Sequence, residues 1–226
     1  MTRPRPVIAI DGPAGAGKST VAQLLAKRLG FVLVDTGALY RALALVARET
    51  AVDWNDGAGL GALATSLDLK FVPVEGAAPR LFAGERDLSA AIRTPEISMG
   101  ASDVSKHPEV RAALLSLQRQ LGKEGGVVLE GRDIGTVVFP DAEAKIFLTA
   151  SAEVRAHRRV KDLASRGIRA DLGQTLAEIQ ARDAQDSGRS VAPLRAAPDA
   201  IVLDTTNLDM DAVVDELARL AQAKGA

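Results

Sequence analysis

Short apolar runs alternate along this chain with segments whose apolar residues recur at helical spacing. Five runs, rich in Val, Ile and Leu, fall at 7–10, 31–35, 127–130, 145–149 and 201–204. After the first run, one helical face collects Val21, Leu24, Leu25 and Leu29, and Gly30 follows as a predicted C-cap. Apolar strands that alternate with amphipathic helices are typical of a parallel sheet covered on both faces. We therefore predict an α/β fold in three layers, α/β/α, around a five-stranded parallel sheet.

Roughly ninety residues separate the second and third runs, whereas a crossover between parallel strands needs only about a dozen. Within this interval, LDLKFVPV (67–74) and PRLFAGERDLS (79–89) are strand-like stretches bounded by turn residues. We expect an insertion at about 37–100 that contains a small antiparallel sheet flanked by helices. A second irregular region, at about 155–170, is rich in arginine. Both are expected to belong to one domain spanning 1–226.

The composition narrows the classes of function. The 226 residues are 47% hydrophobic and 25% charged, as expected for one large globular domain. Basic and acidic residues nearly balance, with a net charge of −1, so a general footprint for nucleic acid or an anionic membrane is missing. The lack of cysteine excludes disulfides, thiol catalysis and cysteine-ligated zinc. Because MTRPRPVIAIDG enters the first strand without a long apolar segment, we expect no membrane span and a cytoplasmic location.

The stretch IAIDGPAGAGKST (8–20) leads from a predicted strand into a predicted helix and contains the pattern G-x-x-x-x-G-K-[ST]. In this motif the backbone N–H groups surround phosphates, the lysine reaches the β- and γ-phosphates, and the hydroxyl can hold Mg²⁺. A glycine-rich turn with a solvated lysine is the alternative, but spacing, flanks and residue types all fit the motif. We expect a nucleoside triphosphate to bind Gly12, Pro13, Ala14, Gly15, Ala16, Gly17, Lys18, Ser19 and Thr20.

A phosphate-binding loop alone does not separate a kinase from a switch or motor that hydrolyses its nucleotide. The Asn-Lys-x-Asp signature of guanine recognition is absent from the sequence. A small-molecule kinase needs a second anion site, and DTGALYR (35–41) and LEGRDIGT (129–136) end strands at the sheet edge where ligands bind. Glu130 is placed there to orient the hydration shell of Mg²⁺. The alternatives are a packing role for Tyr40 and a simple loop ion pair for Arg132 and Asp133.

Two further segments carry arginines. EVRAHRRVKDLASRGIR (153–169) fits a mobile cationic lid that closes on the γ-phosphoryl, although such a run is also typical of a solvated face. In ARDAQDSGR (181–189), Arg182, Asp186 and Arg189 fall on one side of a helix. A surface ion-pair ladder would stabilise that helix by only about 0.3–0.5 kcal/mol per pair, so stability alone is a weak reason for it.

These segments together resemble the bacterial cytidylate kinases over essentially the whole chain. The matching stretches, in family order, are IDGPAGAGKST, DTGALYR, SDVSKHPEVRAAL, EGRDIGTVVFPDA, KIFLTAS, RAHRR, RDAQDS and AIVLDTT. Among them, GRDIGTVVFPDA is the most specific. The resemblance implies a P-loop kinase that transfers the γ-phosphoryl of ATP, with Mg²⁺, to CMP or dCMP. We expect a monomer. A kinase of UMP or shikimate is the alternative, and a nucleotide-dependent regulatory protein is a more distant one.

The resemblance also implies roles for individual residues. Cytosine would be recognised by Ser102, Arg111 and Asp133. The pentose would contact Thr36, Arg182 and Asp186, and the acceptor phosphate would contact Arg41, Arg132 and Arg189, with Tyr40 packed beside the nucleotide. The catalytic candidates are Lys18, Arg132, Arg158 and Arg159. Mg²⁺ would bind Ser19 directly and Glu130 through water. Thr36 and Glu130 stand where some relatives have serine and aspartate, which retains the functional group.

Overall fold

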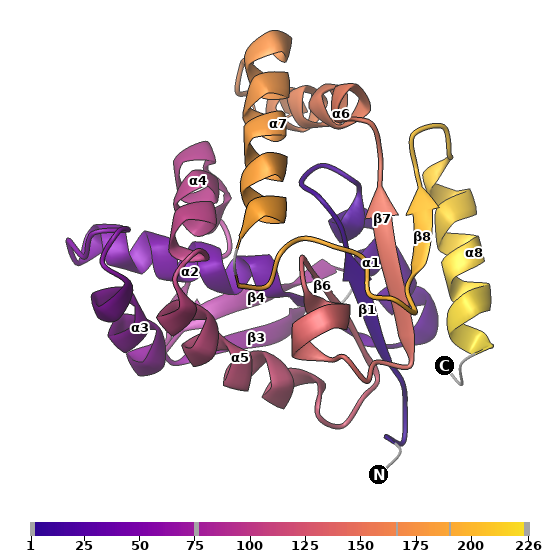
Figure 1. Cartoon of the computed structure of the whole chain (residues 1–226). Helices are drawn as coiled ribbons and strands as arrows, with labels where there is room; N and C mark the ends of the chain where they lie inside the picture. Colours follow the sequence, from indigo (N-terminus) through magenta and orange to yellow (C-terminus); the bar gives the residue numbers. More distant parts are fainter. Residues whose placement is uncertain (1–2, 75–76, 166, 190, 224–226) are drawn as a thin grey trace.

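The computed structural model, which describes residues 3–74, 77–165, 167–189 and 191–223, has a five-stranded sheet at its centre (Figure 1). In spatial order the strands are β2 (Val32–Asp35), β6 (Val127–Gly131), β1 (Val7–Asp11), β7 (Ala144–Thr149) and β8 (Ile201–Asp204). Every neighbouring pair is parallel. The predicted parallel sheet is confirmed, and each predicted apolar run overlaps one of its strands.

Alternate residues of β1 face opposite layers, which explains why this strand is apolar on both sides. Ile8 and Ile10 pack in one hydrophobic cluster with α1 and α8, whereas Val7 and Ala9 pack in another with η2 and α5. The covering elements are α1 (Lys18–Leu29), α8 (Met210–Gln222), the π-helical turn η2 (Ile134–Val138) and α5 (Pro108–Gly122). The three predicted layers are therefore present.

The carboxyl ends of three strands meet at one edge of the sheet. The register places Asp11 beside Gly131 and Asp35 beside Glu130. Because the chain leaves all three strands at this edge, the loops that follow them share one space, where open α/β folds bind their ligands.

The long interval after β2 folds around a hydrophobic cluster of its own. It comprises α2 (Thr36–Glu49), α3 (Gly57–Ser66), β3 (Leu69–Val74), β4 (Ala77–Ala83), β5 (Arg86–Asp87), η1 (Ala91–Arg93) and α4 (Pro95–Val104), followed by α5. The three strands form an antiparallel sheet in the order β3-β4-β5, as predicted. Leu39, Leu43 and Leu60 are fully buried in the cluster, which also includes Val110 and Leu114 of α5, past the predicted boundary near residue 100.

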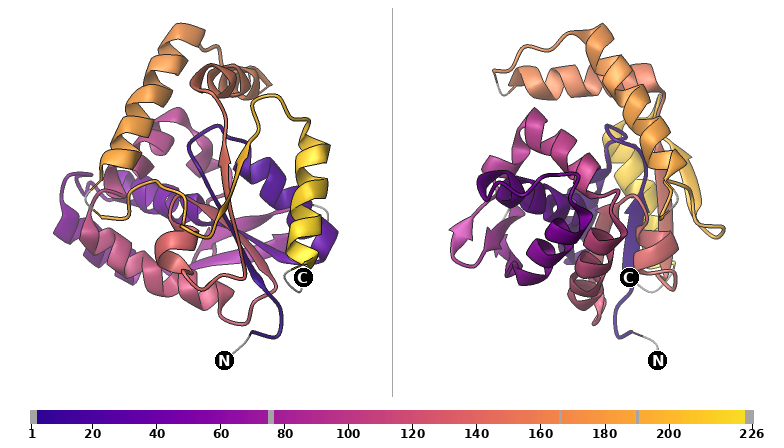
Figure 2. Two further views of the ribbon diagram at one scale, coloured as in Figure 1. Left: turned by 45° about the vertical axis from the view of Figure 1, so that its right-hand side comes forward. Right: turned by 60° about the vertical axis from the view of Figure 1, so that its left-hand side comes forward.

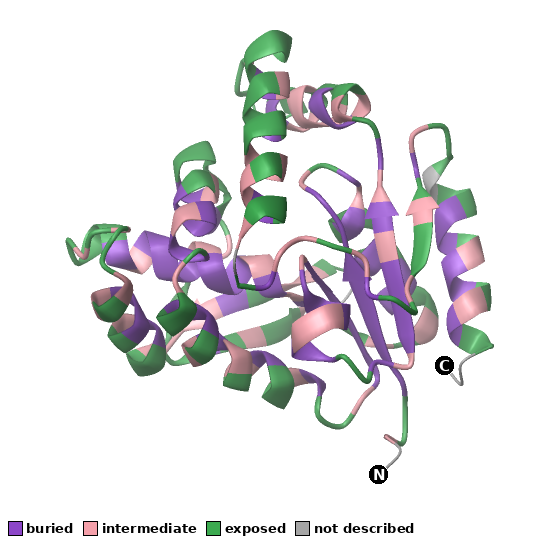
Figure 3. Ribbon diagram, in the orientation of Figure 1, coloured by how far each residue is buried: buried purple, intermediate pink, exposed green. Residues whose placement is uncertain are grey.

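Two helices lie beyond the carboxyl edge of the sheet, α6 (Ala152–Ser165) and α7 (Leu172–Gly188). Figure 2 shows them as a hairpin above the ends of the strands, and Figure 3 shows that most of α7 is exposed whereas most of α6 is half-buried or buried. Their buried residues are few and include two charged ones, Arg155 and Asp186. The predicted arginine-rich segment covers most of α6 and the connection to α7; Arg166, within it, lies outside the described residues.

Because the insertion has a hydrophobic cluster of its own, truncating a side chain buried in that cluster should destabilise the protein. Leu43→Ala removes a fully buried side chain of α2 and is expected to lower the free energy of unfolding by about 2–5 kcal/mol. The matched control is Leu24→Ala on α1, where the side chain is 37% exposed, with an expected change within about 1 kcal/mol. Urea denaturation followed by far-UV circular dichroism measures both. Equal losses in the two variants would contradict the assignment of Leu43 to a tightly packed core.

Candidate active site

The loop between β1 and α1 has a backbone that requires glycine at its first position. Gly12 has a φ of 148°, and a Cβ at this residue would lie 2.0 Å from the carbonyl oxygen of Leu148 in β7. Gly17, at the other end of the loop, is the N-cap of α1 and has a left-handed φ of 90°. The helix thus begins at Lys18, and the N–H groups of its first turn make the loop suited to an anion.

Side chains hold the carbonyl oxygens of this loop in place. Lys18 Nζ donates a hydrogen bond to the carbonyl oxygen of Pro13 at 2.7 Å, and Arg155 Nη1 donates to that of Ala14 at 3.2 Å. The hydroxyl of Thr205, after β8, donates to the carbonyl oxygen of Ala16 at 3.3 Å. Burial, with Arg132 nearby, lowers the pKa of the Lys18 ammonium well below its ordinary value. Lys18 is therefore a buried amino group at the base of an anion site, where a bound phosphate would favour its charged form.

Two carboxylates and a hydroxyl meet beside the loop. Ser19 Oγ donates to Glu130 Oε2 at 2.8 Å, and the Asp35 side chain both caps α2 and binds Arg41 Nη2 at 2.6 Å. Glu130 is buried, and its burial together with the nearby Asp35 raises the pKa of its carboxyl group to about 7. Thr36, the first residue of α2, donates its hydroxyl to the carbonyl oxygen of Glu130 at 2.7 Å.

Asp11 joins the phosphate loop to the loop after β6. Its two carboxylate oxygens accept hydrogen bonds from the backbone N–H groups of Ile134 and Gly135, each at 2.8 Å. Burial raises the pKa of this carboxyl group to about 6. These bonds fix the backbone that directly follows Arg132 and Asp133, so Asp11 positions two candidate site residues although it was not among the predicted ones.

A buried ion pair lies on the side of the cleft formed by the insertion. Arg111 of α5 binds the carboxylate of Asp133, and its guanidinium lies over the Tyr40 ring at 5.7 Å from the ring centroid. Burial raises the pKa of the Tyr40 hydroxyl. The arrangement places a carboxylate, a guanidinium and an aromatic ring side by side, which suits a flat polar ligand.

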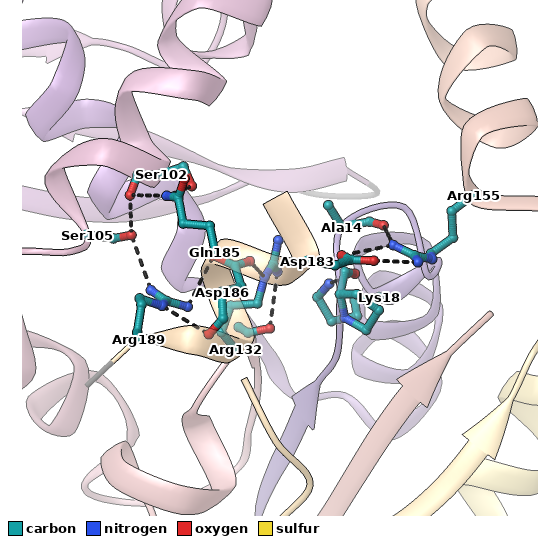
Figure 4. A network of polar contacts seen from close by, with 12 residues as sticks. Ala14, Lys18, Ser102, Ser105, Arg132, Arg155, Asp183, Gln185, Asp186 and Arg189 are labelled. Atoms are coloured by element: carbon teal, nitrogen blue, oxygen red, sulfur yellow. Dashed lines mark hydrogen bonds and ion pairs between the residues drawn. The ribbon is translucent and has the colours of Figure 1, made fainter. Parts of the chain in front are cut away.

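Charged residues of α7 continue the cleft on the opposite side (Figure 4). Asp186 Oδ2 accepts a hydrogen bond from Arg132 Nε at 2.9 Å, and its Oδ1 lies 3.3 Å from Arg189 Nη2. Arg189 also donates to the hydroxyl of Ser105 at 3.3 Å. Arg182 Nε is buried with no hydrogen-bond acceptor in the described part of the chain. Burial, with Arg132 and Arg41 nearby, lowers the pKa of the Arg182 guanidinium to about 10.

Cationic side chains outnumber acidic ones around the resulting cleft. Among the described residues, seven cationic side chains line it: Lys18, Arg41, Arg111, Arg132, Arg159, Arg182 and Arg189. The four acidic ones are Asp35, Glu130, Asp133 and Asp186. The excess of positive charge, next to a phosphate-binding loop, can hold more than one phosphate group.

The structure brings most of the predicted site residues to this one cleft. They are Ala14, Gly15, Lys18, Ser19, Thr36, Tyr40, Arg41, Arg111, Glu130, Arg132, Asp133, Arg159, Arg182, Asp186 and Arg189. Seven others are not among the residues that line it: Gly12, Pro13, Ala16, Gly17 and Thr20 of the phosphate loop and the start of α1, and Ser102 and Arg158. The hydroxyl of Ser102 accepts a hydrogen bond from Gln185 Nε2 at 2.8 Å, and Arg158 donates to the carbonyl oxygen of Thr205 at 2.7 Å. The roles predicted for all of these residues stay predictions.

The chain is similar over almost its whole length to a family of known proteins. The family model described as cytidylate kinase matches residues 8–223. A cytidylate kinase of Syntrophotalea carbinolica is 51% identical over 214 residues, which cover 95% of this chain and 91% of the relative. One of Exiguobacterium sibiricum is 52% identical over 215 residues, which cover 95% and 96%.

Similarity to solved structures is at the level of the fold. A crystal structure of an uncharacterized protein from Eubacterium ventriosum superposes with a TM-score of 0.52 at 13% identity, covering 97% of this chain and 99% of that one. The family match, in contrast, spans the phosphate loop, the strand-end carboxylates and the arginines of α7 together. On the evidence of this match and of relatives about half identical over nearly their whole length, this chain belongs to the cytidylate kinase family.

Proposed function

We propose that the cleft transfers the γ-phosphoryl group of ATP to CMP or dCMP, which yields ADP and CDP or dCDP. The observation that carries this proposal is the excess of buried positive charge between the phosphate loop and α7, including Arg182, whose Nε has no acceptor among the described residues. A triphosphate and an acceptor phosphate facing each other would supply the missing negative charge. Direct transfer needs positioning and charge stabilisation rather than a covalent enzyme intermediate.

On the donor side, the triphosphate would lie against the phosphate loop and the first turn of α1. Lys18 would exchange the carbonyl oxygen of Pro13 for the β- and γ-phosphates and stabilise the charge that develops during transfer. Ser19 and Glu130 provide oxygen atoms 2.8 Å apart, and oxygen is the ligand that Mg²⁺ prefers. The bound ion would neutralise charge on the phosphates. We propose that Ser19 contacts it directly and that Glu130 contacts it through water.

On the acceptor side, each charged group has a proposed partner. The acceptor phosphate would contact Arg41, Arg132 and Arg189, and the pentose would contact Thr36, Arg182 and Asp186. Asp133 would accept the N4–H of cytosine, and Arg111 would donate to the N3 or O2 acceptors. Tyr40 would pack beside the base, with Ser102 as a further contact. Arg158 and Arg159 would close over the transferring group.

The insertion and the arginine-rich segment are proposed to have separate roles. The insertion, predicted at about 37–100, would bind the monophosphate, and the arginine-rich segment at about 155–170 would act as the lid of a single domain. Within the described ranges, no helix is long and apolar enough to cross a membrane. The cytoplasmic location and the monomeric state remain predictions from the sequence.

A panel of acceptors tests the proposed reaction. With Mg²⁺ and ATP, we expect ADP release to depend on CMP or dCMP and to be far slower with UMP, AMP or shikimate. A coupled spectrophotometric assay of ADP measures each rate. A preference for UMP or shikimate would contradict the proposed acceptor and indicate a kinase of that other small molecule. ADP release at the same rate without any acceptor would contradict phosphoryl transfer and favour a hydrolysing regulatory protein.

The raised pKa of Glu130 predicts how stability depends on pH. The folded protein retains a proton on Glu130 up to a pKa of about 7, whereas an unfolded glutamate loses it near its ordinary pKa of about 4.3. Stability therefore falls as pH rises through this window. Glu130→Gln removes this dependence, so the variant should gain on the order of 2 kcal/mol relative to wild type between pH 5 and pH 8.

Urea denaturation at both pH values, with EDTA present, measures the effect. Asp11 is retained in both proteins, so its own titration cancels in the comparison. Glu216→Gln, which removes an exposed carboxylate on α8, should keep the wild-type pH dependence. Parallel pH profiles for wild type and Glu130→Gln would show that Glu130 is ionised throughout this range.

The carboxylate of Asp133 is expected to set the preference for cytosine over uracil. Uracil would oppose it with the O4 lone pairs, a penalty on the order of 2–4 kcal/mol, or roughly 30- to 1000-fold in kcat/KM. Asp133→Asn keeps the shape but offers a donor and an acceptor, so the ratio of kcat/KM for CMP over UMP should collapse toward unity. Asp103→Asn, exposed on α4, is the control. If activity falls while the ratio survives, Asp133 positions Arg111, and base recognition belongs to Arg111 and Ser102.

A further inference from the structure

The three arginines at the start of α6 point to three different places. Arg159 lines the cleft, and Arg158 binds Thr205 after β8. Arg155, in contrast, is buried between the phosphate loop and α7. Arg155 is therefore in a position to connect the two elements that flank the cleft, and it was part of the predicted lid without a role of its own.

Each nitrogen of the Arg155 guanidinium donates a hydrogen bond to the protein. Its Nε donates to the carbonyl oxygen of Ala150 at 2.9 Å, and its Nη1 donates to that of Ala14 in the phosphate loop at 3.2 Å. Nη1 and Nη2 also bind the two carboxylate oxygens of Asp183, at 3.1 and 2.6 Å. An arginine that contacts a transferring phosphoryl group needs donors directed at that group. Because every nitrogen of Arg155 already serves a protein acceptor, its geometry fits positioning rather than contact with substrate.

The backbone supports the same connection. A Cβ at Gly15 would lie 3.1 Å from the Cβ of Arg155 and 3.3 Å from its carbonyl oxygen. The tip of the phosphate loop therefore packs directly against the first turn of α6. A movement of the loop around a triphosphate would be transmitted to Arg155 through packing as well as through the hydrogen bond to Ala14.

Asp183 extends the connection into α7, the helix that carries Arg182 and Asp186 and ends at its C-cap Arg189. Figure 4 shows Asp183 together with Asp186 and Arg189. Its ion pair with Arg155 is bidentate and largely buried, with side-chain exposures of 26% for Asp183 and 6% for Arg155. Pairs of this geometry hold two elements in one orientation better than single-contact surface pairs do. On another side of α7, Gln185 binds the hydroxyl of Ser102 in α4. The helix α7 thus contacts the insertion directly and the phosphate loop through Arg155.

We propose that Arg155 and Asp183 are positioning residues that couple the donor site to the acceptor site through α7. A nucleotide that orders the phosphate loop would fix Arg155, and Arg155 would fix Asp183 and so the acceptor-facing residues of α7. Because ATP has then already ordered the residues of α7 that face the acceptor, CMP loses less conformational entropy of the protein on binding and binds more tightly. By thermodynamic linkage, CMP strengthens ATP binding by the same factor. This inference rests on the proposed function, because it takes ATP and CMP as the two ligands.

The test compares two dissociation constants of CMP in each variant, measured by calorimetry. One is measured alone and the other with saturating Mg²⁺ and the β,γ-imido analogue of ATP. In wild type we expect the analogue to tighten CMP binding by about fivefold or more. Asp183→Asn removes the charge and the bidentate contact while it keeps the size of the side chain, and its ratio should fall below about twofold. A loss of fold stability alone does not change this ratio, because both constants come from the same folded variant.

Asp215→Asn is the matched control, since it removes an exposed ion pair between α1 and α8, with Arg28, by the same chemical change. It should keep the wild-type ratio. If Asp183→Asn does not fold, Arg155→Lys, which keeps the cation but loses the fork, takes its place with the same expectation. An unchanged ratio in the folded Arg155 or Asp183 variant, an equal loss in Asp215→Asn, or no coupling in wild type overturns the inference. Failure of wild type to bind CMP and the analogue would instead count against the proposed function.

Discussion

Buried positive charge is the constraint on which this cleft depends. Arginines that converge on one space repel one another, and the pKa of Arg182 is lowered first by its burial and then by Arg132 and Arg41. The fold tolerates the arrangement because acidic side chains are placed among the cations. Asp35 binds Arg41, Asp133 binds Arg111, and Asp186 lies between two arginines. The acids reduce the repulsion without cancelling the excess charge that phosphates require.

The acids and the cations come from different parts of the chain. Asp35, Glu130 and Asp133 follow or end strands of the central sheet, so the parallel register brings them together. Most of the arginines come from helices of the insertion and from the hairpin α6–α7. The ion pairs that neutralise charge are therefore also the contacts that join these units to the sheet. The same ion pairs therefore balance the charge of the cleft and fix the relative placement of the units.

Sequence patterns predicted the sheet, the phosphate loop and the strand-end residues of the cleft because each depends on local order, whereas Arg111 was named only through the family resemblance. The strand-loop-helix context of Lys18 and the strand ends at Asp35 and Glu130 follow from periodicity and spacing alone. The direction of an arginine side chain does not. Arg155, Arg158 and Arg159 occur within five residues of one another, yet their targets depend on how α6 is rotated against α7 and β8.

Asp11 was missed for a related reason. A single aspartate at the end of an apolar strand is an ordinary turn residue in sequence, and its partners, Ile134 and Gly135, lie more than a hundred positions away. An acid in the last position of a fully buried strand was the available signal.

The close approach of Gly12 to β7 affects how the two nucleotides are aligned with each other. There is no room for even a methyl group between this residue and the carbonyl oxygen of Leu148. The backbone at the start of the phosphate loop is therefore held directly against β7. The donor phosphates thereby lie at the end of the buried central strand of the sheet. Alignment of the reacting atoms then falls to the acceptor, which is carried by helices with their own core and by the hairpin α6–α7. The sheet thus fixes where the donor phosphates lie, and the acceptor is the substrate whose position is adjusted.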